Sequence, residues 1–384
     1  MDERLFKSER TGKLQWESNG MYHRFEPKKL PFEIKDNQEL TNKLMETAIS
    51  IGRLDGISNK FNVKEMKLLI TPFLFKEATI SSEIEGTRAT LSDVYKSEKE
   101  TENNREKALD NQEIKNYINA LKFGLNKPKE EILTEEFVKE LHKMLLTGTR
   151  GEDKSPGKYK TDQNAIGKST DTLQTAKFVP ASPSSTRILM EDFVDFFNEN
   201  SINPLYKSAL LHYQFEAIHP FRDGNGRIGR LLIMIYLCKE GLLNQPLLYP
   251  SEYFKMKRDE YVDRLFETSA EGKVEAWILF FLTALNVQAK RSFYFANKLK
   301  DYKQELMNNL KEKNKSPHLF NVIDMLFENP YLRIRDIKTR AGISSPAAMR
   351  MANFLKSERV LFEFEKRERN KVFLATEILK ILEM

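Results

Sequence analysis

Twelve consecutive residues, from His219 to Arg230, bring together groups that could do phosphate chemistry. Gly224 and Gly226 straddle Asn225, and because glycine reaches backbone angles that other residues avoid, successive N–H groups can turn toward one centre. The residues from Arg227 onward predict a helix that begins at this bend, and the unpaired amides and dipole of a helix start favour an anion. The stretch therefore predicts a phosphate site.

Four titratable or charged side chains surround this predicted phosphate site. Arg227 and Arg230 are three residues apart, so both guanidinium groups can reach phosphoryl oxygens from one helix face. Asp223 precedes the bend and is suited to hold a hard cation such as Mg²⁺ against the same phosphates. His219 titrates near neutrality and can take a proton from an attacking hydroxyl. Together these groups suit a nucleotide that is gripped by its phosphates, bridged by metal and open to attack.

Two predicted helices must position these groups. Residues 202–217 have apolar side chains at helical spacing and deliver His219 at their end, whereas the run after Arg227 is apolar on every face, as in a central buried helix that stops at Gly241. An Asn-Gly pair is more often a hairpin turn, and a lone histidine at a helix end is usually structural. The helices predicted on both sides and the density of charged groups argue against a hairpin turn and against a purely structural histidine.

The same stretch matches every fixed position of HPFxDGNGRxxR and so resembles the signature of the Fic family. The resemblance implies an all-helical core and transfer of AMP from ATP to a Ser, Thr or Tyr hydroxyl of a protein. It implies that His219 is the general base and that Asp223 is the Mg²⁺ ligand. It also implies that Arg227 contacts the β-phosphate and Arg230 the γ-phosphate. The nucleotide-binding residues expected in the loop and helix start are Gly224, Asn225, Gly226, Arg227, Ile228, Gly229 and Arg230.

A second informative stretch reads as a helix over residues 73–85, with Pro72 in its first turn and Gly86 as its stop. Ser81 and Glu85 are four apart and share a face near the C-terminal end. A carboxylate is disfavoured at that end of a helix unless a cation lies nearby. From spacing alone, we predict that Glu85 is an ordinary surface glutamate.

The resemblance changes that reading, because Fic proteins that restrain themselves carry an inhibitory motif, [S/T]xxxE[G/N]. Ser81, Glu85 and Gly86 occupy its fixed positions. By analogy, Glu85 pairs with Arg230 and occupies the place that the γ-phosphate needs, so that ATP binds unproductively. A competing phosphate can replace a carboxylate at an arginine, which makes such a pair a plausible switch.

Between positions 148 and 183, glycine, serine, threonine and proline interrupt the helical pattern. A long irregular segment inside a helical domain is usually functional. The segment resembles the family's flap, a β-hairpin beside the active site whose backbone pairs with the target protein as an added strand. Lys160 stands where the family more often has arginine, and Ala165 where it has an aromatic residue. The residues expected to dock the target are Gln163, Asn164, Ile166 and Gly167.

Two tyrosines, Tyr249 and Tyr253, lie in a segment that resembles the family's border of the nucleotide base. Either ring could stack on an adenine, but buried tyrosines are common and a structural role is equally supported. The family often has asparagine at the position of Lys257.

Composition limits the remaining functions. The 384 residues can form two or three domains, and 62 basic against 56 acidic residues give a net charge of +6, which by itself is too mild to argue for nucleic acid. One cysteine excludes a disulfide framework, and no Cys/His spacing predicts zinc. The charged N-terminus lacks a signal peptide's apolar segment and no apolar run is long enough to span a bilayer, so we expect a cytoplasmic location and no membrane partner.

We therefore expect a mainly α protein in three parts. Residues 1–100 form an N-terminal helical region with the inhibitory helix, 101–313 the Fic catalytic core with its short β-hairpin flap, and 314–384 a winged helix-turn-helix-like domain of three helices and a hairpin. This last module is only slightly basic, so dimerisation and target docking are nearly as well supported as DNA binding. The expected DNA-phosphate contacts are Arg350, Lys356, Lys366, Arg367 and Arg369.

The sequence thus predicts an adenylyltransferase that uses Mg·ATP to modify an unknown target protein and itself. Three alternatives stay open. The same site could remove AMP, with Glu85 orienting a water molecule. It could use another nucleotide, or the chain could be a DNA-binding regulator whose pocket senses nucleotide.

Overall fold

The computed structural model describes residues 1–58, 63–97, 104–128, 131–167, 170–199, 202–313, 316–364 and 371–384. The protein is mainly helical, as predicted, and it also contains two small antiparallel sheets, of which the N-terminal one was not predicted. The helices are η1 (Glu3–Leu5), α1 (Gln38–Asp55), α2 (Val63–Ile84), α3 (Leu91–Ser97), α4 (Arg105–Leu125), α5 (Glu135–Leu146), α6 (Pro183–Asn198), α7 (Pro204–Ile218), α8 (Asn225–Lys239), α9 (Ser251–Met256), α10 (Arg258–Glu271), α11 (Val274–Lys311), α12 (Leu319–Glu328), α13 (Ile334–Ala341), α14 (Ser345–Ser357) and α15 (Thr376–Glu383). The strands are β1 (Gly12–Glu17), β2 (Tyr22–Pro27), β3 (Tyr331–Arg333), β4 (Phe362–Glu363) and β5 (Val372–Leu374). Within the described residues, no helix combines the length and apolar character needed to cross a membrane.

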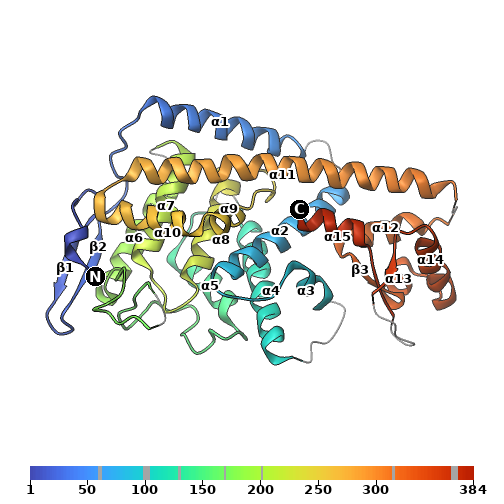
Figure 1. The fold of residues 1–384 in the computed structure, drawn as a ribbon, viewed down its shortest axis with the longest axis horizontal. Helices are drawn as coiled ribbons and strands as arrows, with labels where there is room; N and C mark the ends of the chain where they lie inside the picture. Colours follow the sequence, from blue (N-terminus) through green and yellow to red (C-terminus); the bar gives the residue numbers. More distant parts are fainter. Residues whose placement is uncertain are drawn as a thin grey trace.

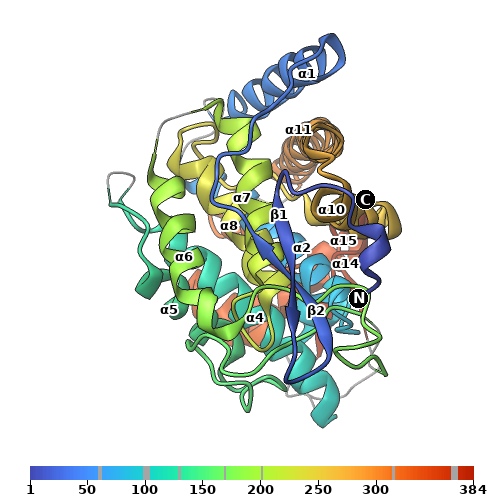
Figure 2. The ribbon, with the colours of Figure 1, turned by 90° about the vertical axis from the view of Figure 1, so that its left-hand side faces the viewer.

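Helix α11 is the longest element, with 38 residues, and runs along the long axis of the molecule with α1 beside it (Figure 1). The β1–β2 hairpin lies at one end of the molecule and α13 and α14 lie at the other (Figure 1), so the hairpin faces the viewer when the molecule is turned (Figure 2). Helix α8 lies in the middle and packs on α7 and α4, which explains why its sequence is apolar on every face. The site predicted at the start of α8 is therefore held by a buried scaffold.

Helix α7 begins with Pro204 after an Asn203 cap whose side chain accepts the Leu205 N–H at 2.9 Å. It ends at His219, which has φ 51° and ψ 60°. Left-handed backbone costs a residue other than glycine about 1–2 kcal/mol, so surrounding contacts must hold His219 in this conformation. Gly224, with φ 76°, then turns the chain into α8. The two predicted helices and the bend between them are confirmed.

Helix α2 extends further than the sequence predicts. Pro72 lies inside it, so the prediction that Pro72 occupies the first turn is wrong. Leu69 and Phe73 on either side of the proline are both buried. Their burial outweighs the one backbone hydrogen bond that proline cannot donate. The predicted C-terminal stop at Gly86 agrees with the end of the helix at Ile84.

The flap segment contains little regular strand. One antiparallel bridge joins Ile166 and Phe178, with N–H···O distances of 2.8 and 3.2 Å. Residues 168 and 169 lie outside the described part of the chain. The bridge nevertheless brings the two halves of the flap together beside the end of α7, where the sequence places them.

The C-terminal part follows the end of α11. The charged run from 298 forms the last third of this helix, and Leu299, Leu306 and Leu310 are buried. The elements α12, β3, α13, α14, β4, β5 and α15 follow, with the strands ordered β3–β5–β4. The sequence anticipated the three helices α12–α14 and the last two strands, whereas β3 and α15 were not predicted. The winged-helix assignment stays a prediction.

This C-terminal part packs on the N-terminal helices. Asn329 donates to the Tyr95 carbonyl at 3.0 Å, and the Tyr331 hydroxyl lies 2.6 Å from Ser92 Oγ. Of the expected DNA contacts, Arg350 is exposed and Lys356 pairs with Glu363 at 3.2 Å, whereas Lys366, Arg367 and Arg369 lie outside the described residues. The three-part domain division and DNA binding both stay predictions.

Candidate active site

A cleft of about 540 Å³ opens where the end of α7, the start of α8 and the end of α2 meet. His219, Gly226, Arg230 and Glu85 all line it, so the structure brings together the groups that two distant stretches of sequence predicted. This volume is within the range of small-molecule sites. The cleft is the candidate active site.

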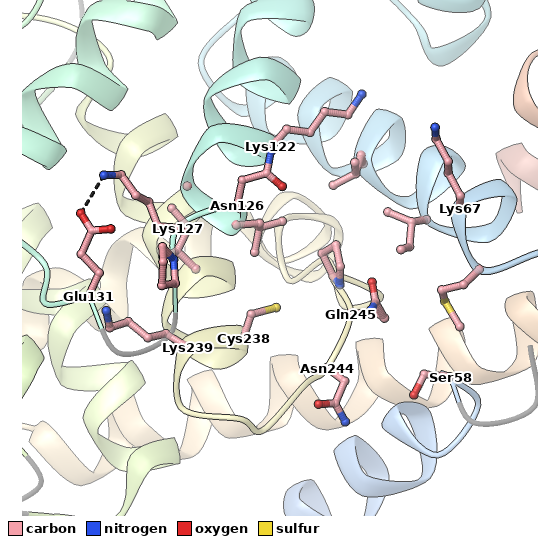
Figure 3. A pocket seen from close by; sticks show the side chains of 18 of the residues that line it. Ser58, Lys67, Lys122, Asn126, Lys127, Glu131, Cys238, Lys239, Asn244 and Gln245 are labelled. Atoms are coloured by element: carbon pink, nitrogen blue, oxygen red, sulfur yellow. Dashed lines mark hydrogen bonds and ion pairs between the residues drawn. The ribbon is translucent and has the colours of Figure 1, made fainter. Parts of the chain in front are cut away.

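A second cavity, of about 660 Å³, lies between α2, α4, α5 and α8 (Figure 3). Its described walls are mainly apolar, with lysines at the rim, and Lys127 is tied to Glu131 at 2.7 Å (Figure 3). Among the described residues that line this cavity, none is a histidine or an arginine. Size alone therefore does not identify the functional site, and the smaller cleft carries the chemistry.

The imidazole of His219 is four-fifths buried at the edge of the cleft. Burial, followed by the positive charge of Lys160, lowers the pKa of His219 to about 3. The ring is therefore neutral at physiological pH, which is the form that accepts a proton. Its Nδ1 lies 3.7 Å from Glu216 Oε2, and burial raises the pKa of this glutamate to about 8.

The bend after His219 is braced by its own side chains. The Phe221 N–H donates to Asn225 Oδ1, and Asn225 Nδ2 donates to the Phe221 carbonyl, both at 2.8 Å. The Gly224 N–H donates to Asp223 Oδ1 at 2.6 Å. In the described part of the chain, no acceptor is in reach of the N–H groups of residues 225–227. These first-turn amides of α8 can therefore receive an anion.

His142 supports the same bend from α5. Its ring stacks on Phe221 with centroids 3.7 Å apart. Nδ1 accepts the Gly157 N–H at 2.9 Å, so Nε2 carries the proton that is donated to the Asp223 carbonyl, also at 2.9 Å. Burial lowers the pKa of His142 to about 4. These contacts give His142 a structural role at the bend.

Arg230 is 1% exposed and is held by the end of α2. It donates to Ser81 Oγ at 2.9 Å, to the Ser81 carbonyl at 2.8 Å and to Glu85 Oε1 at 2.8 Å. Burial would raise the pKa of Glu85, but the charge of Arg230 and its hydrogen bond hold it below its ordinary value. The predicted contact between Glu85 and Arg230 is therefore present.

The carboxylate of Glu85 also lies against the start of α8. A Cβ built on Gly226 would be 2.2 Å from Glu85 Oε1 and 2.9 Å from an Arg230 nitrogen. Because Glu85 remains 38% exposed, solvent reaches this carboxylate from the cleft. A side chain of the protein thus occupies the place where an anion would meet both the helix start and the arginine.

The carboxylate of Asp223, the predicted magnesium ligand, is only partly engaged by other groups of the protein. Its side chain is 43% exposed, and Oδ1 is used by the Gly224 N–H and faces Arg227 at 3.4 Å. One partly exposed carboxylate suits Mg²⁺, which usually keeps several waters and shares its remaining positions with substrate phosphates. In the described residues no group of three acidic, histidine or cysteine side chains forms a protein-only metal cage. The residues present fit a magnesium ion brought with a nucleotide.

Of the nucleotide-binding residues predicted in α8, some face the cleft and others are packed inside the protein. Arg227 is buried and faces Glu113 at 3.6 Å as well as Asp223, so it does not line the cleft. Ile228 is fully buried, and a Cβ on Gly229 would meet Glu216 Oε1 at 2.5 Å, so both residues serve close packing of α8. Gly226 and Arg230 remain as the residues of α8 that face the cleft.

The structure does not bring the two predicted base-stacking tyrosines to the cleft. Tyr249 is 1% exposed, packs on Phe73 and lies under the amine of Lys76, which is 5.1 Å from its ring centroid. Tyr253 is half-buried and packs on Phe280. Neither lines the candidate site, and the apolar wall there comes instead from α10, with Tyr261, Val262, Leu265 and Phe266.

The predicted docking residues of the flap divide into two pairs. Ile166 and Gly167 line the cleft. Gln163 donates to the Pro180 carbonyl at 3.0 Å, and Asn164 donates to the carbonyls of His219 and Phe221 at 3.2 and 2.9 Å. The side chains of this second pair are therefore engaged inside the protein.

Three residues at the site were missed by sequence reasoning. Glu216 is three residues before His219 on the same helix face, a spacing that could have indicated it. Arg258 had no such signal, and Lys160 was indicated only as a flap residue, because the contacts of both depend on segments far apart in the sequence.

Comparisons with known sequences agree with this site. The Fic/DOC family profile matches residues 132–237, and the Fic/DOC family N-terminal profile matches residues 41–126. A probable protein adenylyltransferase of Aquifex aeolicus is 31% identical over 190 residues, which are 49% of this chain and 55% of that protein. Protein adenylyltransferase fic-1 of Caenorhabditis elegans is 30% identical over 131 residues, or 33% of this chain and 23% of that protein. The matched residues thus cover about half or less of the length of each of these two relatives.

Solved structures show the same fold. A Fic family protein from Desulfovibrio desulfuricans aligns with a TM-score of 0.56 at 18% identity, over 89% of this chain and 97% of that chain. A Fic domain containing signalling protein from Bacteroides thetaiotaomicron aligns with a TM-score of 0.52 at 24% identity, over 67% of this chain and 95% of that chain.

The fold and the site thus define a helical protein of the Fic type. The two profile matches together cover half of the chain. The chain belongs to the Fic/DOC family.

Proposed function

We propose that this protein transfers AMP from ATP to a hydroxyl of a target protein and that Glu85 restrains the transfer. The observation that carries the proposal is that a neutral, buried imidazole lines the same cleft as Gly226 and Arg230, next to the free first-turn amides of α8. The relatives named as protein adenylyltransferases support the same activity.

In the proposed reaction, His219 takes the proton of the attacking hydroxyl while its oxygen bonds to the α-phosphorus of ATP. The bond from the α-phosphorus to the bridging oxygen breaks, and pyrophosphate leaves. The amides of residues 225–227 and the guanidinium of Arg230 face the charge that develops on the phosphoryl oxygens. The apolar wall of α10 suits the adenosine, in place of the two tyrosines that the sequence indicated.

The metal part of this proposal rests on Asp223. A bound Mg²⁺ would neutralise phosphate charge and fix the leaving group. Asp223 is the residue that would hold the ion, through the carboxylate that projects from the bend.

Restraint by Glu85 follows from its position. ATP brings a γ-phosphate to the arginine that Glu85 and Ser81 now hold, and both anions cannot occupy one guanidinium and one helix start. Transfer then requires the end of α2 to release Arg230. Target docking is proposed to use Ile166 and Gly167, which face the cleft, by backbone pairing along the flap.

The test incubates the full chain and its Glu85→Gly variant with α-labelled ATP, alone and with cell lysate, and identifies labelled bands by mass spectrometry. We expect an added AMP on a Ser, Thr or Tyr, including on the protein itself. A matched incubation with γ-labelled ATP must give no label. Label from γ-phosphate, or faster loss of AMP from modified target than its addition, would replace AMP transfer by another reaction of the same site.

Replacing Asp223 by asparagine should raise the Mg²⁺ concentration needed for half-maximal transfer by about tenfold or more, because a neutral amide oxygen binds the hard cation less strongly than a carboxylate does. Initial rates across a magnesium titration, in the Glu85→Gly background, measure this. Asp162→Asn is the control, since that exposed flap carboxylate pairs with Arg222 and does not line the cleft. An unchanged titration for Asp223→Asn would remove this residue from the metal site.

A further inference from the structure

The chain segment that presents His219 is held by four consecutive carbonyl contacts, all made by two residues of the flap. Lys160 Nζ donates to the Ile218 carbonyl at 3.0 Å, and the Lys160 backbone N–H donates to the Pro220 carbonyl at 2.9 Å. Asn164 Nδ2 donates to the two remaining carbonyls of this segment, those of His219 and Phe221. Each carbonyl of residues 218–221 is thus bound by one of these two flap residues.

Lys160 and Asn164 also fix each other. Lys160 Nζ donates to Asn164 Oδ1 at 2.9 Å, which orients the amide so that Nδ2 faces the carbonyls. Lys160 is 3% exposed, although lysine is rarely buried without a specific partner. Its ammonium therefore has a particular task inside the protein and is not a solvated surface charge.

The task follows from the backbone of His219. Its left-handed conformation is disfavoured for any residue with a side chain and persists only where surrounding contacts determine it. Asn225 and His142 brace the downstream half of the bend, at Phe221 and Asp223. The described contacts on the carbonyls of His219 and of its two neighbours come from Lys160 and Asn164.

We infer that Lys160 and Asn164 form a carbonyl clamp, a pair of positioning residues that holds His219 in the orientation needed to take the proton of the target hydroxyl. This inference rests on the proposed function for its kinetic consequence. It assigns to the flap a second role besides target docking, because the same segment that carries Ile166 and Gly167 also sets the geometry of the base.

The ionisable groups around the clamp agree with this role. His219 faces the cationic Lys160 and the carboxyl groups of Glu85 and Glu216, and Lys160 in turn faces Glu26 and Arg24 of β2. Burial lowers the pKa of Lys160 to about 7. The amine next to the base therefore retains its donor N–H groups in either protonation state, and its charge opposes protonation of His219.

The first arm of the test is kinetic and uses the Glu85→Gly protein as background. Lys160→Met and Asn164→Leu each should lower kcat for AMP transfer by about 10- to 100-fold, because a displacement of the base of about 1 Å has effects of that size. The KM for ATP should stay within about threefold, since the clamp does not touch the phosphate site. Lys160→Arg keeps the donors and the charge and should retain most of kcat.

Lys158→Met is the matched control, because Lys158 is an exposed lysine two residues earlier in the same segment. It should leave kcat unchanged. Equal losses for Lys158→Met and Lys160→Met, or a parallel fall in kcat and ATP affinity, would overturn the clamp. An unchanged kcat in both clamp variants would overturn it as well.

The second arm does not depend on activity. The protein has five histidines, so ¹³C-labelled histidine gives a spectrum in which loss of one signal in His219→Ala identifies that ring. A pH titration of this signal should show a higher pKa for His219 in Lys160→Met than in wild type, and no rise in Lys160→Arg. If no variant transfers AMP but this shift appears, the proposed function fails and the clamp stands. If transfer occurs and neither kcat nor the His219 pKa changes, the clamp is wrong.

Discussion

Replacing His219 by alanine should lower kcat for AMP transfer by about 10²- to 10⁴-fold, the range that a positioned general base contributes. The comparison belongs in the Glu85→Gly background, where turnover is not limited by restraint. The imidazole is buried at the edge of the cleft and neutral at physiological pH, so alanine removes the one proton acceptor of the described residues that combines these properties with the anion site. Initial rates with α-labelled ATP measure the loss.

Two controls separate this loss from misfolding. The Kd of a non-hydrolysable ATP analogue should change by less than about threefold, because the phosphate site is on α8 and not on His219. His318→Ala should leave the rate unchanged, since that histidine precedes α12, outside the cleft. Retention of more than a tenth of the activity by His219→Ala would contradict the general-base assignment.

The pH dependence follows from the same side chain. A general base acts in its unprotonated form, and a pKa lowered to about 3 keeps His219 unprotonated well below the ordinary histidine value. Therefore kcat should not fall as the pH decreases from 8 to about 5, whereas an unperturbed histidine would halve the rate near its ordinary pKa of about 6.5.

The features that the sequence predicted most accurately are those that depend on neighbouring residues alone. Thr134 accepts the Phe137 N–H and starts α5, and Thr90 and Asp93 exchange hydrogen bonds at the start of α3, so both helix starts carry residues whose capping preference is visible in the sequence itself. The bend from Asp223 to Gly226 was equally predictable, because glycine and a helix start act through their own backbone.

Long-range packing determined what the sequence could not show. Pro72 lies inside α2 because helices from elsewhere in the chain pack on this helix, and α11 continues past residue 298 with its leucines buried and with α12 and α15 packed on the helix. Contacts between distant segments also determined the positions of residues around the candidate active site. Lys160 was assigned to the flap without any indication of its contacts around His219, and the choice between a base-stacking and a structural role for Tyr249 was open until the fold placed that ring in the core.

The contact of Glu85 with Arg230 was an intermediate case. Spacing alone favoured a surface glutamate, and only the family motif indicated a partner in a helix that begins 140 residues later. The structure places the two side chains 2.8 Å apart. The consequence of that contact for catalysis is therefore the second large effect to be measured.

Replacing Glu85 by glycine should raise the rate of AMP transfer about ten- to hundredfold over wild type, the range produced when a contact of 1–3 kcal/mol that competes with a ligand is removed. In wild type, the carboxylate holds Arg230 and lies over Gly226, where the γ-phosphate would have to bind. Without it, a guanidinium that is almost fully buried can contact phosphate in its place. Initial rates of self-modification and of target modification measure the increase.

Glu83→Gly is the matched control for this prediction. Glu83 lies in the last turn of α2, two residues before Glu85, and pairs with Lys255 at 2.6 Å and not with Arg230, so its replacement introduces a glycine without freeing the anion site. Glu85→Gln keeps the length of the side chain and removes its charge, and should give an intermediate rate because an amide holds a guanidinium more weakly than a carboxylate does. Equal transfer by wild type and Glu85→Gly would show that the ion pair only stabilises the end of α2. A rise in Glu83→Gly as large as in Glu85→Gly would mean that loosening the helix, and not vacating the phosphate position, relieves the restraint.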